Sequence, residues 1–407
     1  MQTTDERHHS RTRSLRYTLL AAILLTFILM VIGGILRVSN ASGACADWPT
    51  CLGSWTPPIE KPAIIDYAHR ALSGLVLPIL ISALLIARRG FRKQPWIIRP
   101  LMLANGLMLM QVILGAWIST SPESNAWVSS LHLLFSLLML TSLVFALLAA
   151  YQDKEEISSH PIFSKGIAFQ SPFARYSLFI FCLSLVLMVS GVAVAGSEPS
   201  RACAAWPLCD ITLAAMQISD WVHVIHRAIV AISAAAMLGY LLSAWRTQRT
   251  QTVTLVAVSA ASTLFFSQAL LGAKMTAGFP TYLLGLHQAT ALAGWIALSL
   301  ALASAGFAAR TCADEKSEIL SIKNRKGYLK DLLMLTKPIV VALLLVTTYA
   351  GMVIGAQSWP SFTLTFWTLL GGFMAAGGSG AINQYIDRYD DEKMQRTQKR
   401  PIPAGRL

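Results

Sequence analysis

The sequence predicts an all-α polytopic membrane protein, with two repeated four-helix transmembrane bundles followed by two further spans. The first observation is composition: 55% of the 407 residues are hydrophobic and 13% are charged, whereas an average soluble domain has about 25% charged residues. The second is a set of long uncharged runs, such as Tyr17–Leu36, Tyr176–Gly196 and Thr252–Ala273. The third is an internal repeat. Together they exclude a soluble enzyme.

Ten spans are expected from these runs, because a transmembrane helix needs roughly 20 predominantly apolar residues. The predicted spans are 17–37, 66–87, 100–120, 127–150, 176–196, 222–245, 252–273, 282–308, 332–356 and 363–386. The first eight form the predicted bundles 17–150 and 176–308, which a cytoplasmic linker, 151–175, connects. The last two follow a second charged linker, 309–331, and belong to a separate module, 332–407.

The distribution of charge predicts the orientation of the spans. Lys and Arg number 33 against 20 Asp and Glu, which gives a net charge of +13. Most of the basic residues lie in the N-terminal segment 1–16, in the loops that follow every second span, and in the tail after residue 386. The positive-inside rule therefore places both termini in the cytoplasm. The excess of positive charge is explained by topology and needs no nucleic-acid partner.

The first 308 residues contain a repeat displaced by 155 to 158 residues. Each copy has a short loop with two cysteines, a His-Arg pair, a glutamine followed four residues later by glycine, and a later histidine. The anchors are Cys45, Cys51, His69, Arg70, Gln111, Gly115 and His132, repeated as Cys203, Cys209, His226, Arg227, Gln268, Gly272 and His287. Because each copy has four spans, both copies keep one orientation, and we expect a parallel repeat about the membrane normal.

Histidines inside the predicted spans are the first candidate site. His69 and His132 lie about three and five residues from the outer ends of their spans, so at about 1.5 Å per residue they share one depth. His226 and His287 repeat this arrangement. Two imidazoles at one level on different helices suit the axial positions of a haem iron. Alternatively, the pairs are buried histidines bonded to backbone. Zinc is disfavoured, because no carboxylate or thiolate cluster lies at that depth in both copies.

Charged neighbours of these histidines suggest further roles. Arg70 and Arg227 follow His69 and His226 directly; each guanidinium is expected either to pair with a haem propionate or to snorkel to the interface. Asp66 precedes His69 by three residues, whereas the repeat places His223 at the equivalent position. This asymmetry indicates that the first bundle reacts and the second holds a fixed cofactor. Alternatively, Asp66 caps the second span.

The paired cysteines, Cys45 with Cys51 and Cys203 with Cys209, lie in loops on the outer side of the membrane. That compartment permits disulfides. Metal binding and redox activity are the alternatives. Cys182 and Cys312 have no partner in the sequence, and neither is assigned a role.

The last spans carry a different motif. Asn383, Asp387 and Asp391 recur every fourth residue, so their oxygens are expected on one helix face, where they can hold Mg²⁺ and a diphosphate. Basic residues that follow can neutralise phosphate oxygens; they are Lys393, Arg396, Lys399 and Arg400. A solvated charged helix end is the alternative. Two spans and one acidic motif are too little for a complete lipid-diphosphate enzyme, so we expect a truncated chain or a fragment.

Residues 17–308 resemble haem A synthase, on the paired cysteine loops, the two His-Arg pairs and the later histidine of each half. This resemblance implies an enzyme that oxidises the C8 methyl of haem O to a formyl group with oxygen from water. It implies that His226 and His287 ligate a resident haem b, and that His69 and His132 flank the substrate haem. Asp66 falls where the family usually has a glutamate. Cys45 and Cys51 would form the disulfide of the first loop.

Residues 331–407 resemble the start of haem O synthase, the protohaem IX farnesyltransferase of the UbiA-type prenyltransferases, on the motif from Asn383 to Asp391 and on Arg396 and Arg400. The second aspartate motif of that family is absent from this chain. The resemblance implies a fusion of consecutive enzymes, in which a module using Mg²⁺, farnesyl diphosphate and protohaem makes the haem O that the first module oxidises.

The sequence therefore predicts a haem A synthase of the bacterial plasma membrane, fused to an incomplete prenyltransferase and passing electrons to a membrane acceptor. Asp66, His69 and His132 are the predicted catalytic residues. The rival is a non-catalytic dihaem cytochrome that carries electrons, which has no need of the Asp66 asymmetry. A transporter is disfavoured, because the polar residues cluster at one depth and do not form a path.

Overall fold

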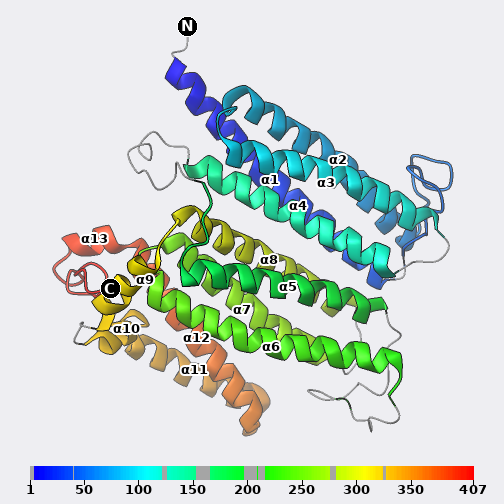
Figure 1. Cartoon of the computed structure of the whole chain (residues 1–407). Coiled ribbons are helices and arrows are strands. Elements are labelled where there is room, and N and C mark those ends of the chain that lie inside the picture. Colours follow the sequence, from blue (N-terminus) through cyan, green and yellow to red (C-terminus); the bar gives the residue numbers. More distant parts are fainter. Residues whose placement is uncertain are drawn as a thin grey trace. The chain divides into compact units, whose positions relative to one another are not determined.

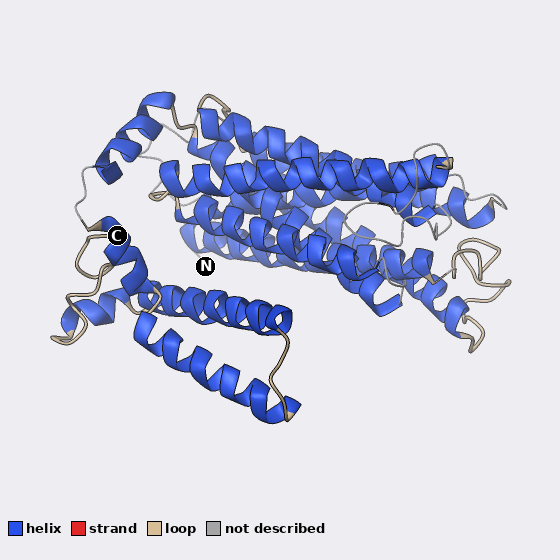
Figure 2. Cartoon of the chain, turned by 90° about the horizontal axis from the view of Figure 1, so that it is seen from below, coloured by secondary structure: helices blue, strands red, loops and turns tan. Residues whose placement is uncertain are grey.

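The computed structural model describes residues 4–39, 41–121, 126–152, 166–196, 209, 216–275, 281–323 and 327–407. The chain divides into two compact units, Met1–Glu318 and Ile319–Leu407. Within the described ranges, every regular element is a helix and no strand occurs, as the single helix colour of Figure 2 makes plain. The predicted all-α class is confirmed.

The first unit is built on eight long helices. They are α1 Thr4–Val38, α2 Lys61–Gly90, α3 Pro95–Thr120, α4 Ala126–Gln152, α5 Pro172–Gly196, α6 Ile218–Thr247, α7 Thr252–Met275 and α8 Thr281–Ala308. In the part of the chain that the structure describes, nine helices are long and apolar enough to cross a membrane, namely these eight and a later helix, α11. The chain is therefore a multi-pass membrane protein, and its first eight predicted spans all form.

The eight helices make two bundles with the same plan. In the first, α1 packs on α2, α2 on α3, α3 on α4 and α4 on α1; in the second, α5 to α8 form the same ring. Figure 1 shows the two sets as a blue-to-teal group and a green-to-yellow group. Diagonal helices, such as α2 and α4, therefore face each other across a bundle interior. The parallel repeat is confirmed.

The contact between the bundles is itself symmetric. α4 packs on its counterpart α8, and α1 packs on α8 as its counterpart α5 packs on α4. Apolar side chains from both halves meet there, among them Leu137, Phe181 and Trp295. The indole of Trp295 donates to the carbonyl of Leu137 at 3.0 Å and to the hydroxyl of Thr141 at 3.0 Å. These contacts fix the two bundles as one packed body.

The predicted linker after the second bundle contains a helix, α9 Cys312–Lys323. Two of its carboxylates contact the second bundle at the turn between α6 and α7 and at Arg310, just after α8. Glu318 forms an ion pair with Arg310 at 2.8 Å and accepts hydrogen bonds from Thr250, and Glu315 accepts one from Gln248 at 3.2 Å. The first part of the linker is thus anchored to the second bundle.

The second unit corrects the ninth predicted span. Instead of one helix over 332–356, α10 Tyr328–Leu335 and α11 Pro338–Ala356 are separated by a break at Lys337, whose φ is +53°. Proline disfavours the helical conformation in the residue before it, so Pro338 starts a new helix.

The tenth predicted span forms as α12 Phe362–Ile386, yet it is not among the nine apolar helices. Five glycines and three threonines dilute its mean hydropathy. A short helix, α13 Arg388–Lys393, follows it. Within this unit, Gln384 donates to the carbonyls of Met334 and Leu335 at 3.2 and 2.9 Å, which ties α12 to the end of α10.

Candidate functional site

Two histidines face the interior of the first bundle from diagonal helices. His69 lies on α2 and His132 on α4, close enough for their side chains to interact electrostatically. The second bundle repeats the arrangement with His226 on α6 and His287 on α8. Each predicted pair is thus brought together across its own bundle.

Every one of these histidines packs against a glycine of a neighbouring helix. A Cβ on Gly33 of α1 would lie 2.8 Å from Cε1 of His69, and one on Gly115 of α3 would lie 3.7 Å from Cε1 of His132. The second bundle matches this, since a Cβ on Gly191 would lie 3.6 Å from His226 and one on Gly272 would lie 3.8 Å from His287. The glycines leave room beside each imidazole that any larger residue would take.

Sequence reasoning singled out two of these four glycines as repeat anchors but missed Gly33 and Gly191. A signal was present, because Gly33 recurs as Gly191 at the same displacement as the cysteine loops. Nothing in the sequence alone distinguishes a glycine that faces a histidine from one that lets helices approach.

A glutamine supports the later histidine of each bundle. Gln111 on α3 donates from Nε2 to the backbone carbonyl of His132 at 2.8 Å, and Gln268 on α7 donates to the carbonyl of His287 at 2.6 Å. The repeated glutamine therefore holds the helix that carries the histidine, a role that the sequence did not reveal.

The four histidines differ in the hydrogen bonding of Nδ1. Among the described residues, the buried Nδ1 atoms of His69, His132 and His287 have no hydrogen-bond partner. Nδ1 of His226 differs, because it shares a hydrogen bond with the hydroxyl of Ser190 at 2.8 Å. A buried polar atom without a partner is costly, and each histidine has a glycine of a neighbouring helix beside it. Each pair could therefore hold a group that takes imidazole ligands from two helices.

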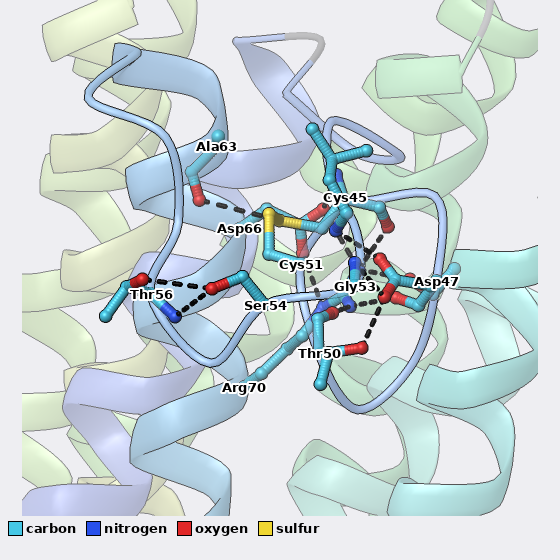
Figure 3. Close-up of a disulfide and its surroundings, with 12 residues drawn as sticks. Cys45, Asp47, Thr50, Cys51, Gly53, Ser54, Thr56, Ala63, Asp66 and Arg70 are labelled. Carbon is cyan, nitrogen blue, oxygen red and sulfur yellow. Dashed lines mark hydrogen bonds and ion pairs between the residues drawn. A yellow bond between two sulfur atoms is a disulfide. The ribbon is translucent and has the colours of Figure 1, made fainter.

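The first-loop cysteines, Cys45 and Cys51, form a disulfide beside the N-terminal end of α2 (Figure 3). This confirms the predicted pair and rules out metal binding by these two thiols. Within the loop, Asp47 accepts hydrogen bonds from the backbone N–H of Gly53 at 2.8 Å and from the hydroxyl of Thr50. These bonds, with the Thr50 hydroxyl as the largest cause, lower the pKa of Asp47 to about 2.

Arg70 joins this loop to the bundle. It donates to the carbonyls of Cys45 at 2.6 Å and Thr50 at 2.7 Å, and to the hydroxyl of Ser119 at 2.5 Å. It also forms an ion pair with Asp66 at 3.0 Å. The guanidinium is therefore neither a snorkelling side chain nor free for a propionate in this structure; it is committed to the loop.

Asp66 is not a helix cap, because α2 begins five residues earlier, at Lys61. The residue is 4% exposed, and its carboxylate accepts hydrogen bonds from Arg70 and from the backbone N–H of Cys45 at 3.1 Å. It remains close enough to interact electrostatically with His69. Asp66 thus connects the loop to the first histidine.

The residues around the His-Arg pair of the second bundle differ. His223 replaces Asp66, and Asp220 closes a capping box with Gln217 at the start of α6. Arg227 contacts the sulfur of Cys209 at 3.9 Å. Cys209 is disulfide-bonded, whereas Cys203, the other cysteine of the predicted pair, lies outside the described residues.

The acidic motif of the second unit does not present all its oxygens together. Asn383 donates to the carboxylate of Asp387 at 2.8 Å, but Asp391 is 2% exposed and pairs with Arg400 at 2.6 Å. The helix is interrupted at Asp387, between α12 and α13. In the described part of the chain, no three His, Cys, Asp or Glu side chains gather as a metal-ion site. Two of the three predicted ligands are therefore adjacent, and the third is committed to an arginine.

Fold and site together define a polytopic membrane protein with two repeated four-helix bundles, each enclosing a histidine pair. The chain belongs to the COX15-CtaA family, described as cytochrome oxidase assembly protein, whose sequence profile matches residues 16–299. Residues 344–407 match the UbiA prenyltransferase family. Both resemblances noted from the sequence are confirmed.

Named relatives include both kinds of enzyme. A "Heme A synthase" from Staphylococcus saprophyticus is 27% identical over 222 residues, which cover 53% of this chain and 70% of that protein. A "Protoheme IX farnesyltransferase" from Roseiflexus castenholzii is 30% identical over 257 residues, 58% of this chain and 47% of that protein. Another, from Thermus thermophilus, is 27% identical over 406 residues, 95% of this chain.

The Thermus relative therefore aligns with both units in the same order, so this fusion has counterparts. The chain spans 47% and 64% of the two farnesyltransferases, between about half and two thirds of their lengths.

Proposed function

We propose that this chain is a haem A synthase, which oxidises the C8 methyl of haem O to a formyl group with oxygen from water. The observation behind this proposal is the duplicated histidine pair, each imidazole packed against a glycine inside its own bundle. Conversion of a methyl group and water to a formyl group releases four electrons and four protons, so the reaction needs an electron acceptor.

The two bundles would divide these tasks. His226 and His287 would hold a resident haem b, with Gln268 fixing the backbone of His287. His69 and His132 would flank the substrate haem in the first bundle, with Gln111 supporting His132. Bound haem b would supply one-electron transfer toward a membrane acceptor.

Asp66 would take a proton or orient water at the substrate. Its proximity to His69 supports this role, and its bonds to Arg70 and Cys45 give it a second one, as the anchor of the disulfide loop. A haem propionate was one of the two partners expected for Arg227 and Arg70, the membrane interface being the other. For Arg70, binding a propionate would require it to give up its hydrogen bonds to the loop.

The protein would lie in a bacterial plasma membrane with both termini in the cytoplasm, on the positive-inside rule. The disulfide loops would then face the outer side, where oxidation is permitted. The bundles 17–150 and 176–308 would form the synthase, with 151–175 and 309–331 as cytoplasmic linkers.

The module 332–407 would contribute to farnesyl transfer onto protohaem, with farnesyl diphosphate as donor. Asn383 and Asp387 would contact the Mg²⁺-diphosphate. Since Asp391 is paired with Arg400, the complete triad does not fit an ion in this arrangement.

A second candidate is a dihaem cytochrome that only carries electrons. One observation favours it: Asp66 has a structural partner in Arg70, so its asymmetry with His223 does not require catalysis.

Pyridine-haemochrome analysis of the purified chain separates the two candidates. A synthase expressed with a haem O supply should contain haem O or haem A beside haem b, and an Asp66→Ala variant should make no haem A. Haem b alone in both bundles would identify the carrier, and a colourless protein would exclude both.

A further inference from the structure

Helix α1 has two adjacent glycines that face two different sites. Gly33 packs against His69 of the first bundle. Gly34 packs against Gln288, which lies on α8 of the second bundle directly after His287. One peptide unit of α1 therefore separates a contact with the first histidine pair from a contact with the second.

Gln288 occupies the space that a side chain at position 34 would need. A Cβ on Gly34 would lie 1.3 Å from Oε1 of Gln288 and 2.1 Å from Nε2. The amide is held there by a hydrogen bond from Nε2 to the carbonyl of Met30 at 3.0 Å. A methyl group at position 34 would overlap this amide, so the end of the Gln288 side chain would have to move away from its place against α1.

A second hydrogen bond links α1 to the other helix of the resident site. Nη2 of Arg37 donates to the carbonyl of Val192 on α5 at 2.8 Å. Val192 directly follows Gly191, the glycine that faces His226. Both hydrogen bonds between α1 and the second bundle thus involve a residue next to the second histidine site. Gln288 follows His287, and Val192 follows Gly191, which packs against His226.

The fold does not require these polar contacts. By the displacement that relates the two copies, the counterpart of Gly34 is Val192 and the counterpart of Gln288 is Leu133. The symmetric position therefore has apolar residues, which pack between membrane helices at no cost of burying an amide. The contact of Gln288 with Gly34 is therefore specific to the α1–α8 interface and is not repeated between α5 and α4.

We propose that the Gly34–Gln288 contact couples the two haem sites. Gln288 is a positioning residue: it fixes the helix turn of His287 against the same step of α1 that forms the wall beside His69. A change in the position of α1 at Gly34 would then move Gln288 and, with it, the neighbouring His287. This inference rests on the proposed function, since it requires haem at His226 and His287.

The test uses the full chain, purified with haem b, and four variants: Gly34→Ala, Gln288→Ala, the double variant, and Gly106→Ala as control. Gly106 lies on α3 with no atom within 4 Å of a built Cβ. The readouts are the midpoint potential and the electron paramagnetic resonance g-values of the haem in the second bundle.

Gly34→Ala should shift both readouts, although residue 34 belongs to the first bundle, and Gly106→Ala should leave both at the wild-type values. The double variant should return to the values of Gln288→Ala alone, because removal of the glutamine frees the space beside position 34. If Gly34→Ala cannot be purified, recovery of folded, haem-bound protein in the double variant is the expected result.

The coupling would be overturned if Gly34→Ala left the midpoint potential and the g-values unchanged. It would also be overturned if the double variant gave the same values, or the same loss of folded protein, as Gly34→Ala alone. In both cases the proposed function would still stand. A wild-type chain without haem at the second pair would overturn both.

Discussion

The two bundles share a backbone plan but differ in how they hold their first histidine. In the second bundle, Ser190 fixes Nδ1 of His226. The repeat displacement places Ile32 at the equivalent position of the first bundle, and Nδ1 of His69 has no partner among the described residues. A hydrogen bond to the distal nitrogen fixes the orientation of a ligating histidine. The difference suits a resident cofactor in one bundle and an exchanging substrate in the other.

The outer loops show the opposite contrast. In the first bundle, Arg70 and Asp66 tie the disulfide loop to α2 and α3. The second bundle has His223 in place of Asp66, and Asp220 closes a capping box at the start of α6. The acid that anchors the disulfide loop of the first bundle therefore has no acidic counterpart at the same position of the repeat.

Removal of single histidines should break this comparison most completely. His226→Ala should abolish haem b binding, because one of the two histidines proposed to hold it is lost, whereas His69→Ala should retain haem b and stop haem A formation. His9→Ala, at an exposed position near the N-terminus, is the control and should change neither. Haem content by pyridine haemochrome measures each variant; equal haem b loss in His226→Ala and His69→Ala would contradict the division of tasks.

Loss of Asp66 should have the next largest effect. The Asp66 and Arg70 side chains are 6% and 9% exposed, and removal of one partner of a buried ion pair costs about 3–5 kcal/mol. Asp66→Ala should therefore release the first loop as well as stop haem A formation. Limited proteolysis between Cys45 and Lys61 measures the release. Asp66→Asn, which keeps the size and the acceptor oxygen, should restore the loop but not activity; full activity in Asp66→Asn would rule out the proton role.

An exchange at the Ser190 and Ile32 positions sharpens the comparison further. Ser190→Ala should lower haem b retention by roughly 10- to 100-fold, the usual effect of losing an outer hydrogen bond to a ligand. Ile32→Ser should introduce such a bond at His69 and slow release of haem from the first bundle. Haem transfer to apomyoglobin gives both rates. If Ser190→Ala releases haem at the wild-type rate, the hydrogen bond does not distinguish the bundles.

The comparison also separates what a sequence can predict from what it cannot. Apolar runs, basic loops and the four anchors were enough to predict eight spans, their parallel repeat and the two histidine pairs, because each depends on residue type and order. The hydrogen-bond partners of the Arg70 side chain were not predictable, since they depend on how the disulfide loop packs against α2. The contact of Gly33 with His69 depends on helix rotation, which hydropathy does not encode. The break before α11 could have been anticipated from Pro338, whose effect on the preceding residue is local.

The smallest predicted effect concerns acid, and it distinguishes the two outer loops. Asp47 has no counterpart in the second copy, where Ala205 occupies its place. The pKa of Asp47 is lowered to about 2 from an unfolded value of about 3.9. A depressed pKa means that the ionised carboxylate stabilises the loop above the unfolded value, and that this contribution is lost as pH falls from about 4 through about 2. Fluorescence of Trp48 and Trp55, both exposed in this loop, should therefore change over that interval in the wild type. In Asp47→Ala the change should be absent, and a transition of the same size in both proteins would assign it to another group.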